Sequence, residues 1–547
     1  ATPTPAVATP APRPEPTPTP TAEPALAVAL LLSDPAERAR IADRLAATSE
    51  YEAAEDPASA GLAISDTPLP GARASFVLQR WVAITDQRRD VLDLSLDDVL
   101  GILRGDIRNW ADLGGSAQPI RVYLPVSQAL RIVDFFGAGA AVLGASLTLD
   151  EEVVDRVAAT PGAFALVAPE ELRLGVLALT VDGHDPYRDP ATLSPLRRAR
   201  WIRAPGPGEA SALAVAAGLR VAPPFEPAGM LVTGELLPVR CSNFVLEYLD
   251  DYGAMFEGVR DAMTAADITV SSLESSLTDR GTPTPCLETY VLQGSPRAVE
   301  AMADAGIDVV FPIGNHIGDC WGGCASALVI RDTLDRLHDA GIATAGAGED
   351  LAAARSPALL TVATARGAVR FAFLGYDSMA PWFQATEFST GAAPLDAEGL
   401  REDIEAAREL ADHVVVGVNW GVEYKSNPNA FQREMAGIAM DAGAALVVGN
   451  HPHWVQAVEH FEGALVSYAG GNFVFDQDWS EETAQGMVIE LGFTGERLIG
   501  YRIRPVVIRG DGGEVYWIYR PEFVDPAGEG RAVLDRIWDA QDRLPER

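Results

Sequence analysis

The sequence predicts an α/β protein with more than one domain. Short apolar runs alternate with helical patterns from residue 25 to about 205, and again from about 229 to 520. This alternation is typical of sheets covered by helices. The chain has 547 residues, which is more than one hydrophobic core usually serves, so length alone predicts two to four domains.

Composition fits a globular protein and excludes some partners. The net charge is −35 and Lys425 is the only lysine. Nucleic acid and anionic lipid are bound by basic surfaces, so we expect neither as a direct partner. No apolar run approaches the roughly 18 residues that cross a bilayer. The apolar run nearest the start, residues 25–32, is expected to be a buried strand.

Residues 1–24 consist almost entirely of Pro, Thr, Ala and Glu. Such a segment buries too little apolar surface to fold, and its prolines favour an extended chain. We interpret it as a stalk of an exported, cell-surface or secreted protein. Any membrane attachment is expected only through an amino-terminal anchor that the sequence does not include. The four cysteines are compatible with an oxidising compartment.

The stretch from Leu94 to Leu124 shows the α/β pattern most clearly. Ser95 is expected to cap a helix with Val99, Leu100 and Leu103 on its apolar face, Gly105 to end it, and residues 120–124 to form a strand. This stretch resembles the phosphate-type periplasmic solute-binding proteins, a resemblance that extends over most of 25–205. We therefore expect an α/β domain like theirs there.

In those binding proteins a Ser-Gly-Thr cluster at a helix amino end holds the anion. The corresponding residues here are Ser127, Gln128 and Ala129, without the glycine that lets the backbone approach a ligand. Two interpretations stay open. The domain either still binds an anion or is a degenerate spacer or partner surface.

Residues 206–228 are rich in Pro, Gly and Ala and are expected to be a linker, followed by a second α/β domain over 229–520 and a terminal helix in 521–547. Several predicted strands of this domain end in polar loops, and ligands bind at the carboxyl ends of strands in open α/β sheets. The loops contain Gly234-Glu235, Ser272-Leu273-Glu274, Gly314-Asn315-His316, Asn419 to Tyr424, and Gly449 to His453.

His451-Pro452-His453 is the sharpest local motif. The residue before a proline favours extended backbone, so we expect the two imidazoles to point to similar sides and to suit a transition metal. Glu235 and Glu274 would add carboxylate ligands, and Asn315 an amide oxygen. This mixed set suits Mn, Fe or Zn better than Ca.

The second domain resembles the CapA family of poly-γ-glutamate capsule synthesis proteins, a branch of the calcineurin-like metallophosphatase superfamily. The matching elements are Leu273-Glu274, Asn315-His316-x-x-Asp319-x-x-Gly322, Trp420-Gly421-x-Glu423-Tyr424, His451-Pro452-His453, Gln456, Glu459, and Ser467-Tyr468 through Asp476. The resemblance implies a metallophosphatase-like α-β-β-α sandwich with one or two divalent metal ions held by loops at one end of the sheets.

The resemblance also implies roles for single residues. The metal ligands would be Glu235, Glu274, Asn315, Asn419, His451 and His453. The catalytic group would be His316, Asp319 and Glu423, with His316 as general acid or electrostatic partner of the leaving group and Glu423 orienting a neighbouring group.

Three positions depart from the family pattern. Glu235 stands where the family usually has Asp, Ser272 where it has Asn, and Asn419 where it has His. Asn419 offers only a neutral oxygen, so the site is expected to be mononuclear, altered in substrate, or inactive.

The cysteines and tryptophans leave further alternatives. Cys241 and Cys286 are candidates to pair with each other, whereas Cys320 and Cys324 form a disulfide, remain thiols or bind zinc. Four tryptophans either line a polymer groove or pack in the core or at its rim: Trp382, Trp420, Trp454 and Trp479.

We expect a metal-dependent hydrolase or transferase of capsule or cell-envelope polymer metabolism. Its substrate would be an anionic polymer of the poly-γ-glutamate type, another envelope polymer or a small molecule. The first alternative is a non-catalytic surface protein that holds polymer or solute. The second is a phosphate sensor whose first domain binds phosphate released by the second.

Overall fold

The computed structural model describes residues 25–54, 60–135, 146–461, 463–510 and 518–545, so the predicted stalk lies outside the described residues. The chain divides into two compact units. One contains Ala1–Gln79 and Arg198–Ala222, and the other contains Arg80–Arg197 and Pro223–Arg547. The region predicted as a solute-binding-like domain is therefore shared between the two units, while its predicted boundaries stay predictions.

The first unit is a small α/β layer. Its sheet has the strand order β2-β1-β3-β12-β4, with β1 and β3 parallel. Ile41 and Leu45 of a helix pack with Val28, Ile64 and Ile202 of the sheet. The elements are β1 (Leu26–Leu31), α1 (Pro35–Ala46), β2 (Tyr51–Ala53), β3 (Leu62–Ser65), β4 (Ala74–Arg80), β12 (Arg197–Arg203) and α5 (Pro207–Ala216).

Part of the predicted linker is helical. Helix α5 lies within residues 206–228, and its Ala210, Leu213 and Ala214 are buried in the core of the first unit. Pro207 occupies the start of the helix, where its missing N–H costs nothing. The proline here starts a helix, and the alanines lie with Leu213 on its buried face. Linkers are rich in the same residues, so composition alone did not distinguish this helix from a linker.

The second unit begins with a separate five-stranded sheet of order β10-β5-β9-β7-β8. Helix α2 confirms the capping prediction, because Ser95 and Asp98 form a capping box and Gly105 ends the helix with left-handed backbone. The elements here are β5 (Val82–Asp86), β6 (Asp93–Leu94), α2 (Leu96–Arg104), β7 (Arg121–Pro125), α3 (Ala129–Phe135), β8 (Ser146–Thr148), α4 (Val153–Ala158), β9 (Ala163–Val167), β10 (Val176–Ala178) and β11 (Thr180–Val181).

Two large sheets form the centre of the rest of the second unit. The first has the order β18-β17-β14-β13-β28-β29-β30, with β27 beside β13, and the second has the order β20-β21-β23-β24-β26-β25. The first comprises β13 (Ala228–Leu236), β14 (Ile268–Leu273), β17 (Val309–Phe311), β18 (Ala343–Thr344), β27 (Asn472–Val474), β28 (Gln485–Phe493), β29 (Leu498–Arg509) and β30 (Arg520–Phe523). The second comprises β20 (Ala358–Thr364), β21 (Gly367–Asp377), β23 (His413–Asn419), β24 (Leu446–Asn450), β25 (Val458–Phe461) and β26 (Ala464–Ser467).

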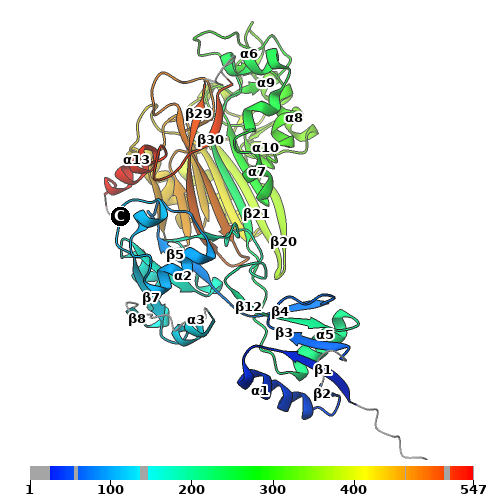
Figure 1. The fold of residues 1–547 in the computed structure, drawn as a ribbon. Helices are drawn as coiled ribbons and strands as arrows, with labels where there is room; N and C mark the ends of the chain where they lie inside the picture. The colour runs from blue at the N-terminus through cyan, green and yellow to red at the C-terminus, as the bar shows by residue number, and fades with distance from the viewer. Residues whose placement is uncertain (1–24, 55–59, 136–145, 462, 511–517, 546–547) are drawn as a thin grey trace, which may run out of the picture. The chain divides into compact units, whose positions relative to one another are not determined.

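These sheets pack face to face with helices outside, which gives four layers. Phe371 and Phe373 of β21 face the core between the sheets, while Ala372 and Leu374 face the core beneath the outer helices. In Figure 1 the green helices α7, α8 and α9 lie along one side of the strands. The helices are α6 (Arg240–Leu249), α7 (Arg260–Ala265), α8 (Arg297–Asp304), α9 (Ser326–Asp339), α10 (Leu351–Arg355), α11 (Ala397–Arg408), α12 (Ala430–Asp441) and α13 (Arg531–Asp542).

The predicted α/β class and the α-β-β-α layering are confirmed. Strands buried on both faces explain the continuous apolar runs that predicted them. The predicted terminal helix is α13, with Ile537 buried in the core between the sheets. Among the described residues, no helix combines the length and the apolar character that a membrane span requires.

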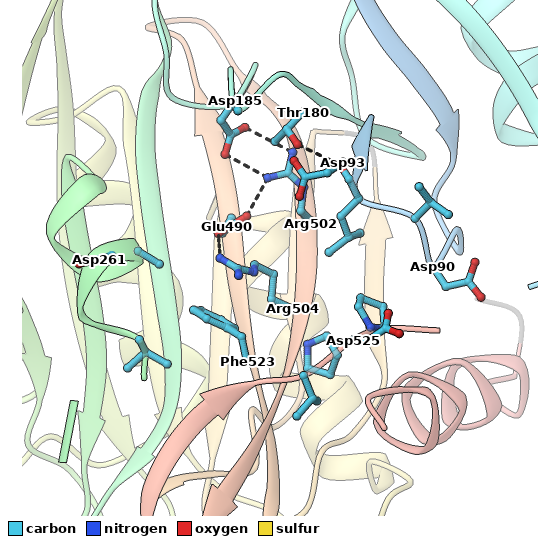
Figure 2. A pocket seen from close by; sticks show the side chains of 18 of the residues that line it. Asp90, Asp93, Thr180, Asp185, Asp261, Glu490, Arg502, Arg504, Phe523 and Asp525 are labelled. Carbon is cyan, nitrogen blue, oxygen red and sulfur yellow. Dashed lines mark hydrogen bonds and ion pairs between the residues drawn. The ribbon is translucent and has the colours of Figure 1, made fainter. Parts of the chain in front are cut away.

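A buried ion-pair network connects residues 80–197 to the large sheet (Figure 2). Arg502 of β29 donates to Asp185 over 3.0 Å, to Glu490 over 2.8 Å, and to the carbonyl of Ala178 over 2.9 Å. Arg504 donates to the other oxygen of Glu490 over 3.0 Å. The network borders a cavity of about 710 Å³ that contains none of the predicted site residues. It fixes this segment to the sandwich.

We predict that Arg502→Met destabilises the protein by about 3–5 kcal/mol, because Asp185 would be left without its buried cation and Glu490 would keep only its pair with Arg504. Arg173→Met is the matched control, since its pair with Asp155 is largely solvent-exposed and should change stability by less than about 1 kcal/mol. Urea unfolding followed by tryptophan fluorescence measures both. Equal losses in the two variants would contradict the structural role assigned to Arg502.

Candidate metal centre

A compact group of carboxylates and imidazoles lies where the ends of the two large sheets meet. One ligand atom each of Glu235, Glu274 and His453 lies within 4.8 Å of the other two. Glu235 is 0% exposed and Glu274 is 1% exposed. Carboxylates so deeply buried need compensating charge or metal coordination.

Both sheets contribute to this group through the carboxyl ends of their strands. Glu235 lies near the end of β13, and Glu274 directly follows β14, in the first sheet. Asn419 ends β23, and His451 directly follows β24, in the second. The predicted convergence of strand-end loops is therefore observed in the fold.

The loop of His451 and His453 does not have the extended backbone predicted from Pro452. His451 has φ 97° and His453 has φ 59°, both in the left-handed region that L-residues rarely adopt. The turn brings the N–H of His451 to 2.6 Å and that of His453 to 3.4 Å from Oε1 of Glu235. These hydrogen bonds to a buried carboxylate offset the backbone strain. Strained backbone of this kind clusters at functional sites.

Glu274 is the most connected carboxylate of the group. Its Oε1 accepts a hydrogen bond from Nδ2 of Asn419 at 2.9 Å and lies 3.0 Å from Nδ1 of His451. Burial raises the pKa of Glu274, but the hydrogen bond and charge of His451 outweigh burial and lower the pKa to about 2. Glu274 is therefore ionised at neutral pH.

The carboxylates raise the pKa of both imidazoles. Burial lowers the pKa of His453, but the charge and contact of Glu235 raise it to about 9. Burial also lowers the pKa of His451, but the hydrogen bond and the charge of Glu274 outweigh burial, so the pKa is raised overall. Nδ1 of His453 also lies 3.0 Å from Oδ1 of Asn472. Because metal ligation requires neutral imidazoles, a bound cation would replace these protons.

Unpartnered oxygens show that the residues fit a metal ion. Among the described residues, several buried side-chain oxygens of this group make no hydrogen bond, although one of them, Oε2 of Glu235, also lies in ion-pair contact with His453. A buried oxygen without a partner costs free energy unless something binds it. The oxygens with neither a hydrogen bond nor an ion-pair contact are Oε2 of Glu274 and Oδ1 of Asn315, Asn419 and Asn450.

The three predicted catalytic residues share one cavity beside this group. Nδ1 of His316 lies 2.7 Å from Oδ2 of Asp319, which also accepts the N–H of Leu292 at 2.8 Å. Asp319 therefore fixes the ring of His316. The cavity measures about 410 Å³ and is lined by Tyr290, Asn315, His316, Asp319, Met379, Trp382, Glu423 and His451. All nine predicted site residues thus lie in this cluster or line this cavity, while their chemical roles stay predictions.

Sequence reasoning missed two polar residues of the site. Asp377 ends β21 in register with Asn419, and burial raises its pKa to about 6 despite hydrogen bonds from the amides of Ala380 and Met379. Asn450 lies in register with Asn419 on the other side and donates to Oγ of Ser272. Asn450 directly precedes His451 in the sequence, so its position was an available signal, whereas the place of Asp377 follows from its register with Asn419 on the neighbouring strand.

The predicted anion position in the amino-terminal region is closed by an acidic side chain. The N–H of Ser127 donates to Asp150 at 3.0 Å, and its hydroxyl contacts the same carboxylate. The indole of Trp81 donates to Oε1 of Gln128 at 3.0 Å. Asp150 therefore accepts the hydrogen bonds that Ser127 would otherwise donate to a bound anion. This observation favours the degenerate interpretation, which stays a prediction.

The cysteines pair as Cys241 with Cys286 and Cys320 with Cys324, and no described cysteine is free. The first pair links the start of α6 to the segment that carries Tyr290. Of the four tryptophans considered for a groove, Trp420 is fully buried and donates to the carbonyl of Tyr468, so it packs in the core. Trp382 is the one that lines the cavity.

We predict that Gly314→Ala disrupts the site. A Cβ there would lie 2.7 Å from Cγ of Glu274 and 2.8 Å from Nδ2 of Asn419, at φ 130°. We expect a loss of about 1–3 kcal/mol in stability and weaker metal binding in calorimetric titration. Gly495→Ala, where a Cβ meets nothing within 4 Å, is the control. Unchanged metal affinity in the Gly314 variant would contradict the close packing described here.

The chain is similar to capsule proteins over the same segment. Residues 229–477 match the family model described as bacterial capsule synthesis protein PGA_cap. The PGA biosynthesis protein CapA of Bacillus subtilis is 29% identical over 253 residues, which cover 46% of this chain and 64% of that protein. The capsule biosynthesis protein CapA of Bacillus anthracis is 31% identical over 202 residues, which cover 36% of this chain and 47% of that protein. The chain thus spans about half to two thirds of the length of these relatives.

Solved structures resemble the chain more distantly. An ABC-type phosphate transport receptor from Vibrio cholerae has a TM-score of 0.21 and 16% identity, covering 35% of this chain and 93% of the receptor. The sulfate thiohydrolase SoxB of Thermus thermophilus has a TM-score of 0.33 and 15% identity, covering 59% of this chain and 63% of that protein. The motifs that suggested the capsule family lie inside the matched segment, so residues 229–477 carry a domain similar to the bacterial capsule synthesis protein PGA_cap.

Proposed function

We propose that residues 229–520 form a metal-dependent hydrolase or transferase that acts on a capsule or cell-envelope polymer outside the cytoplasm. The observation that carries this proposal is the set of buried oxygens without hydrogen-bond partners around Glu235, Glu274 and His453. A divalent Mn, Fe or Zn ion would satisfy these oxygens and use both imidazoles. The names of the relatives support a role in capsule or PGA biosynthesis.

The ligand set follows from which atoms face the cluster. Glu235, Glu274, His451 and His453 would hold the ion, with Asn315 and Asn419 offering amide oxygens. When bound, the metal would supply an activated water and polarise the substrate oxygen. Asn419 also donates to Glu274, so it orients a carboxylate ligand even where its own oxygen binds weakly.

The chain's own residues supply proton transfer and orientation. His316 lines the cavity, and Asp319 holds it through Nδ1. A ring fixed in this way would present its other nitrogen to the leaving group and donate a proton there. Glu423 lines the same cavity and would accept a hydrogen bond from the substrate.

The second candidate is a non-catalytic surface protein that holds polymer or solute. Asn419 favours it, because an amide replaces the imidazole expected in the family and lowers the affinity for a second metal. Both candidates would bind polymer, but only the metal-dependent enzyme would convert it to product.

We predict that the purified full-length protein retains about one transition metal per chain, and that His453→Ala loses it because the buried cluster loses a nitrogen ligand. His338→Ala is the control, since His338 is exposed and bonds only to Thr344 among the described residues. Elemental analysis by plasma mass spectrometry gives the content. Wild-type protein that stays metal-free after incubation with Mn, Fe and Zn would disprove the metal centre.

We predict that His316→Ala lowers turnover by about 10²–10⁴-fold while metal content stays unchanged, as expected for loss of a general acid. Turnover is measured on a chromogenic phosphodiester and on purified envelope polymer. Asp319→Asn should give a smaller loss, because it weakens the orientation of His316 and keeps the ring. Binding of polymer without turnover in the metal-loaded wild type would favour the non-catalytic candidate.

A further inference from the structure

Residues 279–292 form a strap that leads from β15 (Ser276–Leu277) to β16 (Gln293–Gly294) and reaches the candidate cavity with Tyr290. Tyr290 lines this cavity and is 87% exposed. An aromatic ring left exposed beside a cavity is placed to contact a bound molecule, because tyrosine combines a broad apolar face with a hydroxyl. The position of the strap therefore decides whether this ring is available to the site.

Hydrogen bonds to the loop between β17 and α9 fix the base of the strap. The N–H of Thr282 donates to the carbonyl of Trp321 over 3.4 Å, and the N–H of Leu292 donates to Asp319 over 2.8 Å. The N–H of Trp321 donates in turn to Oε1 of the buried Gln293 over 2.8 Å. These bonds do not depend on the tip of the strap, so we expect the base to stay in place when the tip is released.

The tip of the strap, residues 286–290, is fastened by two consecutive residues of α6. Cys241 forms a disulfide with Cys286. One terminal nitrogen of the Arg240 guanidinium donates to the carbonyl of Thr289 over 3.1 Å. The ring that lines the cavity belongs to the next residue, so both connections fix its backbone.

The two fastening residues are themselves held by Asp476, which lies just beyond β27. Nε of Arg240 donates to Asp476 over 2.9 Å, and the N–H of Cys241 donates to the same carboxylate over 3.0 Å. At the start of β27, Oδ1 of Asn472 lies 3.0 Å from Nδ1 of His453. The tip of the strap thus shares an anchor with the wall of the metal cluster.

The disulfide is the part of this anchor that solvent reaches. Cys286 is exposed and Cys241 is half-buried, whereas Arg240 and Asp476 are buried. A soluble dithiol can therefore attack the bond. The exchange takes two electrons and two protons from the dithiol, leaves a thiol on each cysteine and converts the reductant to a disulfide.

We propose that the disulfide between Cys241 and Cys286 is a redox-sensitive clamp that holds Tyr290 at the cavity, where its ring contacts the polymer substrate. With the bond reduced, the tip keeps its hydrogen bond from Arg240 but gains freedom of movement. Binding of polymer then includes the cost of ordering the strap, so the affinity falls. The contact with polymer rests on the proposed function, whereas the clamp itself does not.

Limited proteolysis of the full-length protein tests the clamp, because proteases cleave segments that open locally. We expect dithiothreitol, or Cys241→Ser combined with Cys286→Ser, to speed cleavage by glutamyl endopeptidase after the exposed Glu288 by about fivefold or more. Mass spectrometry measures the rate, and reoxidation of the wild type should restore slow cleavage. The matched control is Cys320→Ser combined with Cys324→Ser, which removes a disulfide outside the strap and should leave the rate unchanged. Equal cleavage of oxidised, reduced and clamp-deficient protein would overturn the clamp.

Isothermal titration calorimetry with poly-γ-glutamate on the metal-loaded full-length protein tests the contact. We expect Tyr290→Ala and the clamp-deficient variant each to bind about fivefold more weakly than wild type, or weaker still, with equal metal content. Tyr290→Phe should retain most of the affinity. Combining Tyr290→Ala with loss of the clamp should cause no further loss, since the clamp acts through this ring. Phe388→Ala is the control, because Phe388 is 91% exposed and lies outside the cavity lining, and its affinity should equal that of wild type.

The outcomes separate this inference from the proposed function. No binding by oxidised wild type, full affinity of Tyr290→Ala, or additive losses in the combined variant would overturn the contact, even if the protein turns over a chromogenic ester. Clamp-dependent proteolysis together with Tyr290-dependent binding in His316→Ala protein would support the inference even if no substrate is turned over.

Discussion

Two carboxylates with almost no exposure to solvent impose the constraint on which the site depends. Glu235 and Glu274 lie between the ends of two sheets, where an uncompensated charge would cost several kcal/mol. The imidazoles of His451 and His453 lie against them, and the carboxylates raise the pKa at which each ring gives up its proton. The same geometry accommodates a metal ion, because a cation would replace those protons and satisfy the unpartnered oxygens.

The arrangement of the sandwich follows from this constraint. Neither sheet alone assembles the cluster, since the carboxylates come from one sheet and Asn419 and His451 from the other. The backbone adapts locally to bring them together. His451 and His453 adopt left-handed conformations that aim their amides at Glu235, and Gly314 has no side chain where Glu274 and Asn419 pass.

The sequence predicted those parts of the fold that follow from local patterns. Strands buried on both faces, such as those ending at Asn419 and Asn450, show continuous apolar runs, and the polar residues after them marked the site edge. The left-handed loop could not be predicted, because the preference of a residue before Pro452 is extended and only the tertiary bond to Glu235 overrides it. Asp377 was missed for a related reason. Its importance comes from register with Asn419 across two strands, which a single sequence does not show.

The amino-terminal region shows the same limit on a larger scale. Helix α2, its Ser95 cap and its Gly105 end were predictable, because each depends on residues a few positions apart. The division of 25–205 between two compact units depends on which distant segments pack together, including the contact of Arg502 with Asp185, which are 317 positions apart in sequence. Helix α5 was not predicted, because its Pro, Gly and Ala residues are common in linkers as well as at helix starts.

Anomalous X-ray diffraction from crystals grown with Mn or Zn tests the central claim most directly, because it locates a metal without reference to activity. The account predicts a single dominant peak bounded by the side chains of Glu235, Glu274 and His453, with His451 turned toward it. A dominant peak elsewhere would contradict the account. So would the absence of any peak while Glu274 and His451 keep their direct hydrogen bond.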